Sequence, residues 1–199
     1  MAFVVAALTV GIGARIAWLN NSGEYTNPVQ TAYHEEGGWA DLDGSFASTA
    51  ASEKTAGYSV RVVSAKVVSY NDWIDRYGDA SQKREGLDSP SVIDVEVEVR
   101  NEGNTDGGLF LLGWKLFPER RNMYYLYDID LLKVNEPKLS DRNLGFAVAP
   151  GATRLVHIPY TINANDPEGM TEYRQNINDA DFELVVTNSP VKHVMELHV

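Results

Sequence analysis

The sequence predicts an all-β fold: an immunoglobulin-like antiparallel β-sandwich of seven to eight strands, preceded by an N-terminal apolar helix. Three observations lead to this prediction. Short runs rich in Val, Ile, Leu and aromatic residues alternate with polar turn segments from residue 58 to the end. Long amphipathic helical patterns are missing there. In Ser91–Arg100, apolar side chains at odd positions alternate with charged ones at even positions after residue 93, which is typical of a sheet with one wet face.

Residues 1–19 are expected to form the apolar helix, a transmembrane anchor or signal-like segment. The run 2–14 holds only apolar or small residues, and residues 16–19 extend it past Arg15. About 20 apolar residues can cross a bilayer. A secretory signal would have a basic start and a small-residue cleavage site, and neither is seen. The alternative is a helix or strand of the domain core; we favour an uncleaved span whose basic start was lost by truncation or a misassigned start.

The flank of this segment indicates an orientation. From Ile16 to Glu53 the chain has no Lys or Arg, and exported flanks of a span avoid basic residues. We therefore expect a single-pass protein of the cell membrane whose domain is extracytoplasmic. Residues 20–36 are polar, with Asn, Ser, Gly and Pro, and are interpreted as a tether. Residues 37–199 are then the sandwich.

The first half of the sandwich is predicted from local patterns. Residues 37–46 form a short strand or a lead-in that docks on the domain. Tyr58–Tyr70 is a Val-rich strand, and a change in its apolar phase indicates a bulge. Residues 71–90 are polar and turn-rich, a long loop with room for one helical turn around Trp73. Ser91–Arg100 is the clearest strand, and Gly-rich and Asn-rich residues turn the chain after it.

The second half continues in the same way. Leu109–Phe117 is almost continuously apolar and predicts a central strand covered on both faces. Met123–Lys133 fits both helical and strand spacing, and we favour a short helix or turn-rich crossover. The remaining strands are expected at 145–148, 155–162, 182–186 and 191–199.

Charge and cysteine content exclude several function classes. Lys and Arg number 17 against 28 Asp and Glu, a formal net charge of -11. This argues against nucleic-acid binding and against docking on anionic lipid through charge. Without cysteine there are no disulfides, thiolate metal sites, thiol catalysis or acylated Cys. Core packing must hold the sandwich together, and attachment to the membrane must be through the N-terminal helix.

Catalytic and phosphate-binding motifs are missing from the chain. One aromatic–acidic cluster stands out and supplies weak binding candidates: Tyr124, Tyr125, Tyr127, Asp128 and Asp130. Exposed aromatic side chains beside carboxylates can bind sugars or peptides. The alternative is that the tyrosines cover one edge of the sandwich. Asp128 and Asp130 are also the paired carboxylates that a hydrolase would need.

Metal sites and cofactors are not expected. Asp41 and Asp43 open a segment similar to the start of a calcium loop, but Ser52 stands where the twelfth-position Glu is required. They are weak calcium candidates, and an Asp-Gly turn is the alternative. The four histidines are expected at solvated or edge positions, because their spacing does not match a ligand motif; they are His34, His157, His193 and His198.

Several stretches carry a resemblance to known proteins: VIDVEVEVRNEGN (92–104), VAPGA (148–152) and FELVVTNSP (182–190). They resemble bacterial extracellular telokin-like, or immunoglobulin-like, domains of unknown function that are tethered by an N-terminal span or lipid. GWADLDGSF (38–46) and GYSVRVVSAKVVSY (57–70) are similar to an uncharacterised family of gut actinobacterial membrane-anchored proteins. The resemblance covers most of residues 37–199 and implies fold and exposure. It implies neither an activity nor catalytic residues.

The expected function is a membrane-anchored, extracytoplasmic binding or structural module of the bacterial envelope, without enzymatic activity. Its partner would be an envelope or extracellular protein, and its acidic charge favours cationic partners or divalent ions. Two alternatives stay open. One is an extracellular hydrolase that uses paired carboxylates, and the other is a small-ligand or metal-sensing domain.

Overall fold

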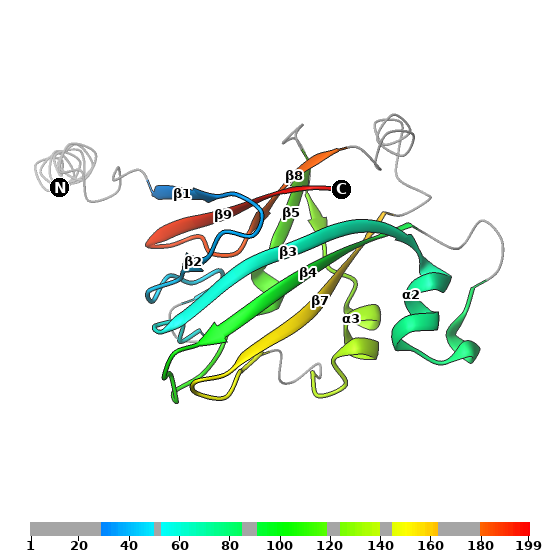
Figure 1. The fold of residues 1–199 in the computed structure, drawn as a ribbon, viewed down its shortest axis with the longest axis horizontal. Helices are drawn as coiled ribbons and strands as arrows, with labels where there is room; N and C mark the ends of the chain where they lie inside the picture. Colours follow the sequence, from blue (N-terminus) through cyan, green and yellow to red (C-terminus); the bar gives the residue numbers. More distant parts are fainter. Residues whose placement is uncertain (1–28, 50–52, 85–90, 119–123, 140–144, 163–179) are drawn as a thin grey trace, which may run out of the picture. The chain divides into compact units, whose positions relative to one another are not determined.

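The clearest strand pattern forms the centre of a sheet in a computed structural model of the chain, which describes residues 29–49, 53–84, 91–118, 124–139, 145–162 and 180–199. Strand β4 (Ser91–Asn101) pairs antiparallel with β3 (Tyr58–Ser69) on one side and with β7 (Thr153–Ile162) on the other. The short strand β2 (Ala40–Asp41) adds to β3. The expected bulge is present, because the β3–β4 register shifts between Val62 and Ser64. Figure 1 shows this four-stranded sheet.

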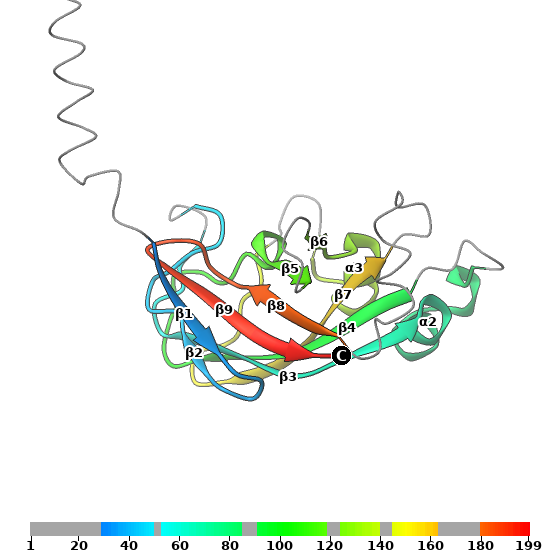
Figure 2. The same ribbon diagram turned by 90° about the horizontal axis from the view of Figure 1, so that it is seen from above.

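A second sheet of five strands lies against the first (Figure 2). Its strands, in spatial order, are β1 (Gln30–His34), β9 (Val191–His198), β8 (Asp181–Val185), β5 (Lys115–Pro118) and β6 (Tyr125–Leu126). Apolar side chains of both sheets meet in one core; they include Val60, Val95, Ile158, Leu116, Leu184 and Met195. The protein is thus mostly β with two sheets, as the alternating patterns predict.

Two short helices lie at one end of the four-stranded sheet, one on its outer face and one beside the edge strand β7. Helix α2 (Tyr70–Tyr77) begins at a capping box in which Ser69 and Asp72 each accept from the other's backbone N–H. Helix α3 (Ile129–Asn135) begins at Asp128, whose carboxylate accepts from two backbone N–H groups. Between the helices and the sheet lies a second, small core that consists of Val68, Tyr70, Trp73, Ile74, Val92 and Leu131.

Parts of the fold differ from the sequence-based prediction. The continuous strand predicted at Leu109–Phe117 is wrong: a 3-10 turn at Leu111–Gly113 precedes the four residues of β5. This turn is apolar because it packs into the core, where a Cβ on Gly113 would lie 2.6 Å from the Ala47 side chain. Residues 71–90 hold the two-turn helix α2 and a short 3-10 helix at Ala80–Gln82 instead of a single turn in a loop.

The N-terminal boundary also differs from the prediction. Gln30–His34 fall in the segment expected to be a tether, yet they form β1 beside β9. The predicted apolar helix at residues 1–19 lies outside the described residues, as does most of the tether. In the described part of the chain, no helix has both the length and the apolar character needed to cross a membrane.

Candidate functional site

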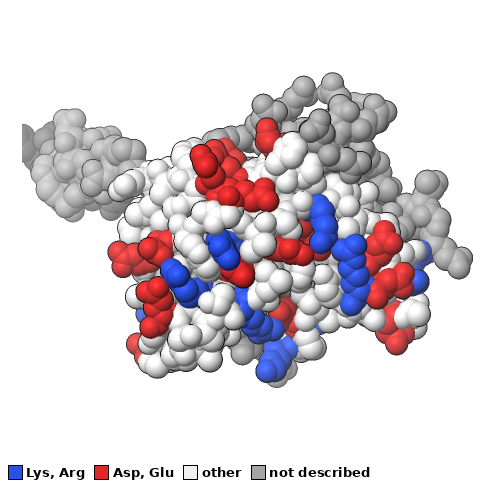
Figure 3. All heavy atoms as spheres, viewed as in Figure 1, with Lys and Arg blue, Asp and Glu red and all other residues white. Residues whose placement is uncertain are grey.

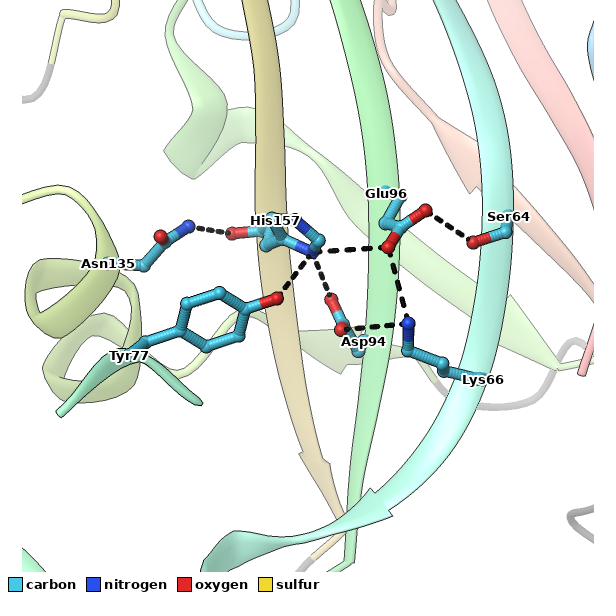
Figure 4. A network of polar contacts seen from close by, with 7 residues as sticks. All are labelled: Ser64, Lys66, Tyr77, Asp94, Glu96, Asn135 and His157. Carbon is cyan, nitrogen blue, oxygen red and sulfur yellow. Dashed lines mark hydrogen bonds and ion pairs between the residues drawn. The ribbon is translucent and has the colours of Figure 1, made fainter. Parts of the chain in front are cut away.

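Strand register brings chemically active side chains together on the outer face of the four-stranded sheet. On this face His157 of β7 stands directly opposite Glu96 of β4, and Ser64 of β3 stands opposite Glu96 on the other side. Two residues along, Asp94 of β4 faces Lys66 of β3. Side chains at alternate positions of a strand share a face, so these five residues form one cluster. We call them the His157 cluster (Figure 4).

One imidazole nitrogen is the centre of the cluster. His157 Nδ1 lies 3.1 Å from Asp94 Oδ1 and 3.7 Å from Glu96 Oε1. The hydroxyl of Tyr77, which helix α2 supplies, lies 3.1 Å from the same nitrogen. Three oxygens therefore face a nitrogen that has only one position for a proton or an ion.

The carboxylates of the cluster are buried to very different degrees. The Asp94 side chain is fully buried, whereas that of Glu96 is 21% exposed. Among the described residues, Asp94 Oδ2 has no hydrogen-bond partner, and Lys66 Nζ lies 3.9 Å from it. A carboxylate oxygen without hydrogen bonds is costly to bury. This oxygen is therefore a site where a further cation would be stabilised.

Glu96 is held ionised by its neighbours. Burial raises the pKa of Glu96, but hydrogen bonds from Ser64 and Lys66 and the positive charge of Lys66 outweigh burial, so that the pKa is lowered. The Ser64 hydroxyl donates to Glu96 Oε2 at 2.7 Å, and Lys66 Nζ donates to Oε1 at 3.2 Å. The two oxygens thus have separate partners, and Oε1 is the one that faces His157.

Helix α2 covers the cluster with aromatic rings. Trp73 is fully buried and its ring lies 4.6 Å from that of Tyr77, measured between centroids. The Tyr77 ring lies 5.0 Å from that of His157. Burial raises the pKa of the Tyr77 hydroxyl, and the negative charge of Asp94 raises it further, so Tyr77 stays protonated. The wet face predicted for β4 is therefore wrong at Asp94, because α2 packs over it.

Around the cluster, acidic and basic side chains alternate. Arg61 pairs with Glu98 at 2.6 Å, and Arg100 lies 3.3 Å from Glu102. Figure 3 shows Lys and Arg side chains among Asp and Glu side chains on this face, and not in a separate patch. The net acidity of the chain is thus partly balanced here, and local geometry decides what the cluster can bind.

The aromatic–acidic candidates do not form one site. Tyr124 is 48% exposed and contacts Phe117, while Tyr125 is buried in the main core. Tyr127 is partly buried, which raises its pKa. Asp128 accepts from the backbone N–H groups of the first turn of α3, and Asp130 is exposed in that turn. The structure therefore gives these five residues different surroundings.

The calcium candidates and the other histidines lie elsewhere. Asp41 accepts from the Ser59 hydroxyl at 2.6 Å, and Asp43 occupies a turn with φ of 44°. His34 Nε2 lies 3.0 Å from His193 Nδ1, with the rings stacked, and His193 is buried. The expectation of solvated or edge histidines is therefore wrong for His193, which is buried on β9 between β1 and β8. His157 lies on β7, an edge strand of its sheet, as expected, although its side chain is only 15% exposed.

Sequence reasoning missed Asp94, Glu96 and His157 as a group. That their side chains point outward from the sheet could be inferred from the sequence, because apolar residues occupy the alternate positions of both strands. What no local pattern shows is that the two strands are neighbours in this register. The apolar pair Trp73–Ile74 within a polar stretch was the available signal that part of this face is covered.

Comparisons with known proteins give a family and one distant structure. A family model described as a domain of unknown function (DUF5028) matches residues 31–193. A comparison with curated proteins finds no match. A crystal structure of a putative lipoprotein from Bacillus subtilis subsp. subtilis str. 168 is similar at 13% identity and a TM-score of 0.40. The similarity covers 74% of this chain and 38% of that one.

Proposed function

We propose that this chain, which belongs to the DUF5028 family of domains of unknown function, is a binding module whose ligand is a divalent transition-metal ion such as zinc. Asp94, Glu96 and His157 supply the ligands. The observation that carries the proposal is that oxygens of two carboxylates and of Tyr77 face a single nitrogen, His157 Nδ1.

Hydrogen bonding alone satisfies this arrangement poorly. A protonated Nδ1 donates one hydrogen, so it pairs well with only one of the two carboxylates. An unprotonated Nδ1 accepts from Tyr77 but then leaves two carboxylate oxygens facing a lone pair. A metal ion bound by Nδ1 and by one oxygen of each carboxylate contacts all three groups at once. It also places positive charge beside the buried Asp94.

The spacing fits a small tetrahedral ion. Zinc binds nitrogen and oxygen ligands at about 2.0–2.2 Å, which places neighbouring ligand atoms about 3.4 Å apart. The distances from His157 Nδ1 to Asp94 Oδ1 and to Glu96 Oε1, 3.1 and 3.7 Å, lie on either side of that value. Calcium prefers six to eight oxygen ligands at longer distances, and magnesium prefers oxygen and water. An imidazole ligand favours zinc, copper, nickel or iron.

The same geometry disfavours a hydrolase at this cluster. A glycosidase needs two carboxyl groups that both reach the substrate. Asp94 is fully buried, so a sugar or peptide cannot contact it. A single ion can still approach, since Glu96 and His157 are partly exposed. We therefore propose that the cluster binds a metal ion without catalysing a reaction. A metal-sensing domain is one specific case of such a binding role.

The proposed location is the cell envelope. The domain would be immunoglobulin-like and extracytoplasmic, anchored in the membrane by residues 1–19, with an envelope or extracellular protein as a further partner. The apolar run at residues 2–14 and the lack of Lys and Arg from Ile16 to Glu53 support this orientation.

Metal titration of the full chain tests the proposed function. In detergent, the wild type is expected to bind one equivalent of zinc, and cobalt(II) in its place is expected to give the strong visible absorption of a tetrahedral site. His157→Gln should abolish both signals. His198→Gln is the matched control, because His198 forms a similar pair with Asp181 at 2.8 Å away from the cluster. Wild-type protein without stoichiometric zinc, or equal binding by His157→Gln, would overturn the proposal.

A further inference from the structure

Lys66 already supplies a positive charge to the oxygens that would hold the metal ion. Its Nζ lies 3.2 Å from Glu96 Oε1 and 3.9 Å from Asp94 Oδ2. Glu96 Oε1 is also the oxygen that faces His157 Nδ1 at 3.7 Å. The ammonium and a bound ion would therefore share one ligand atom. Figure 4 shows Lys66 and His157 on opposite sides of the two carboxylates.

The charge balance indicates that the two cations exclude one another. The two carboxylates carry two negative charges and Lys66 one positive charge, while a metal-bound imidazole is neutral. A divalent ion added with Lys66 in place makes the cluster net positive. The same ion with Lys66 swung away makes it neutral. Like charges at this range repel strongly where burial lowers the dielectric constant.

The structure allows Lys66 to leave while Glu96 keeps a hydrogen-bond partner. The Lys66 side chain is 42% exposed, so its flexible stem can place the ammonium in water. The Ser64 hydroxyl holds the other oxygen of Glu96 at 2.7 Å. Glu96, the ligand that Lys66 contacts most closely, thus has a support that does not depend on the lysine.

We propose that Lys66 is a built-in counter-cation that occupies the site at rest and is displaced when the metal ion binds. This inference rests on the proposed function. It makes metal binding an exchange of one cation for another, with Lys66 lowering the affinity. Such a site loads and unloads with the free metal concentration, as a sensing or carrying site requires, and does not hold a permanent structural ion.

Removal of the ammonium tests the inference. Zinc affinity is measured by competition with a chelating indicator for the wild type, Lys66→Met and Lys83→Met. Lys83 is the matched control, because it pairs with Asp75 at 2.6 Å and its side chain is 39% exposed. We expect Lys66→Met to bind zinc at least about tenfold more tightly than the wild type, since a repulsive charge is lost. Lys83→Met should bind as the wild type does.

A second readout follows Lys66 itself. The rate at which a lysine-specific acylating reagent modifies Lys66, measured by peptide mass spectrometry, should rise when zinc is added, while the rate at Lys83 should not. Unchanged affinity in Lys66→Met together with an unchanged modification rate would overturn this inference and leave the proposed function standing. Weaker binding by folded Lys66→Met would also overturn it. Failure of both the wild type and Lys66→Met to bind zinc would instead overturn the proposed function.

Discussion

His157 Nδ1 lies 3.1 Å from Asp94 Oδ1, although 63 residues separate them in the chain. The antiparallel pairing of β4 with β7 places His157 opposite Glu96, two positions from Asp94 on the same face. Helix α2 then closes over this face with Trp73 and Tyr77. The helix and the cluster are thus parts of one assembly, and the stability of one should affect the other.

Loss of the capping box of α2 should lower both the free energy of unfolding and the zinc affinity. Ser69→Ala removes the oxygen that accepts from the Asp72 backbone N–H at 3.0 Å. We expect the free energy of unfolding to fall by about 1 kcal/mol. Because α2 packs over the cluster and covers the His157 ring with that of Tyr77, zinc affinity should fall as well. Ser69→Asp keeps a capping oxygen and should retain most of both properties in urea denaturation and zinc titration; equal losses in the two variants would contradict a capping role.

Trp73→Ala should lower the free energy of unfolding more than Trp39→Ala does. Trp73 is fully buried between α2 and the sheet, so Trp73→Ala is expected to lower the free energy of unfolding by about 3–5 kcal/mol. Trp39 is only partly buried, and the guanidinium carbons of Arg61 and Arg100 lie 4.8 and 4.5 Å from the centroid of its ring. Trp39→Ala should cost less. Urea unfolding followed by circular dichroism compares them, and the reverse order would show that α2 contributes little to the fold.

The His34–His193 pair should make the fold less stable in mild acid. Burial lowers the pKa of both rings below the ordinary 6.5, and His34 lowers that of His193 further. The unfolded chain therefore binds more protons as the pH falls through 6.5 toward the lower folded-state values. The stability contributed by the neutral pair is present above pH 6.5 and is lost below it.

Substitution of one partner tests this pH dependence. His34→Gln can keep a hydrogen bond to His193 but cannot become charged, so its stability should vary less between pH 7.5 and 5.5 than that of the wild type. Thermal or urea unfolding at several pH values measures the effect; identical profiles for wild type and His34→Gln would rule the pair out as its source.

Glu53 should stabilise two loops through hydrogen bonds. Glu53 is 4% exposed, and its carboxylate accepts from the backbone N–H groups of Ser48 at 2.6 Å and Phe110 at 3.3 Å. Glu53→Ala removes both acceptors, and we expect a loss of about 1–3 kcal/mol in the free energy of unfolding. Glu102→Ala, at an exposed position, should change it by less than about 0.5 kcal/mol. Similar values for the two variants would contradict the role of Glu53.

Sequence patterns predicted much of the fold because a strand with one buried face leaves a period of two. The strands β3, β4 and β7 match the predicted runs closely, and the bulge of β3 lies where the apolar phase changes. Prediction failed where apolar residues are buried in a turn and not in a strand. The run at Leu109–Phe117 is apolar because a 3-10 turn enters the core, and periodicity does not distinguish such a turn from a central strand.

The His157 cluster could not be predicted from the sequence as the strands could. The Tyr124–Asp130 segment was chosen because its aromatic and acidic residues are adjacent in sequence, yet those residues point into different surroundings. In contrast, the residues of the His157 cluster come from distant segments and are individually unremarkable. Closeness in sequence therefore does not show which side chains lie together, because a sheet brings residues together by register and not by sequence distance.

By itself, the sequence determined which faces of the strands are apolar, because side-chain alternation along a strand is a local property. It also determined that cysteine chemistry is impossible and that the chain is acidic. Only the tertiary structure decided that His157 lies beside Glu96 and that α2 buries Asp94. The physical reason is that strand pairing and helix packing depend on long-range contacts, and these alone fix the distances on which the chemistry of a site depends.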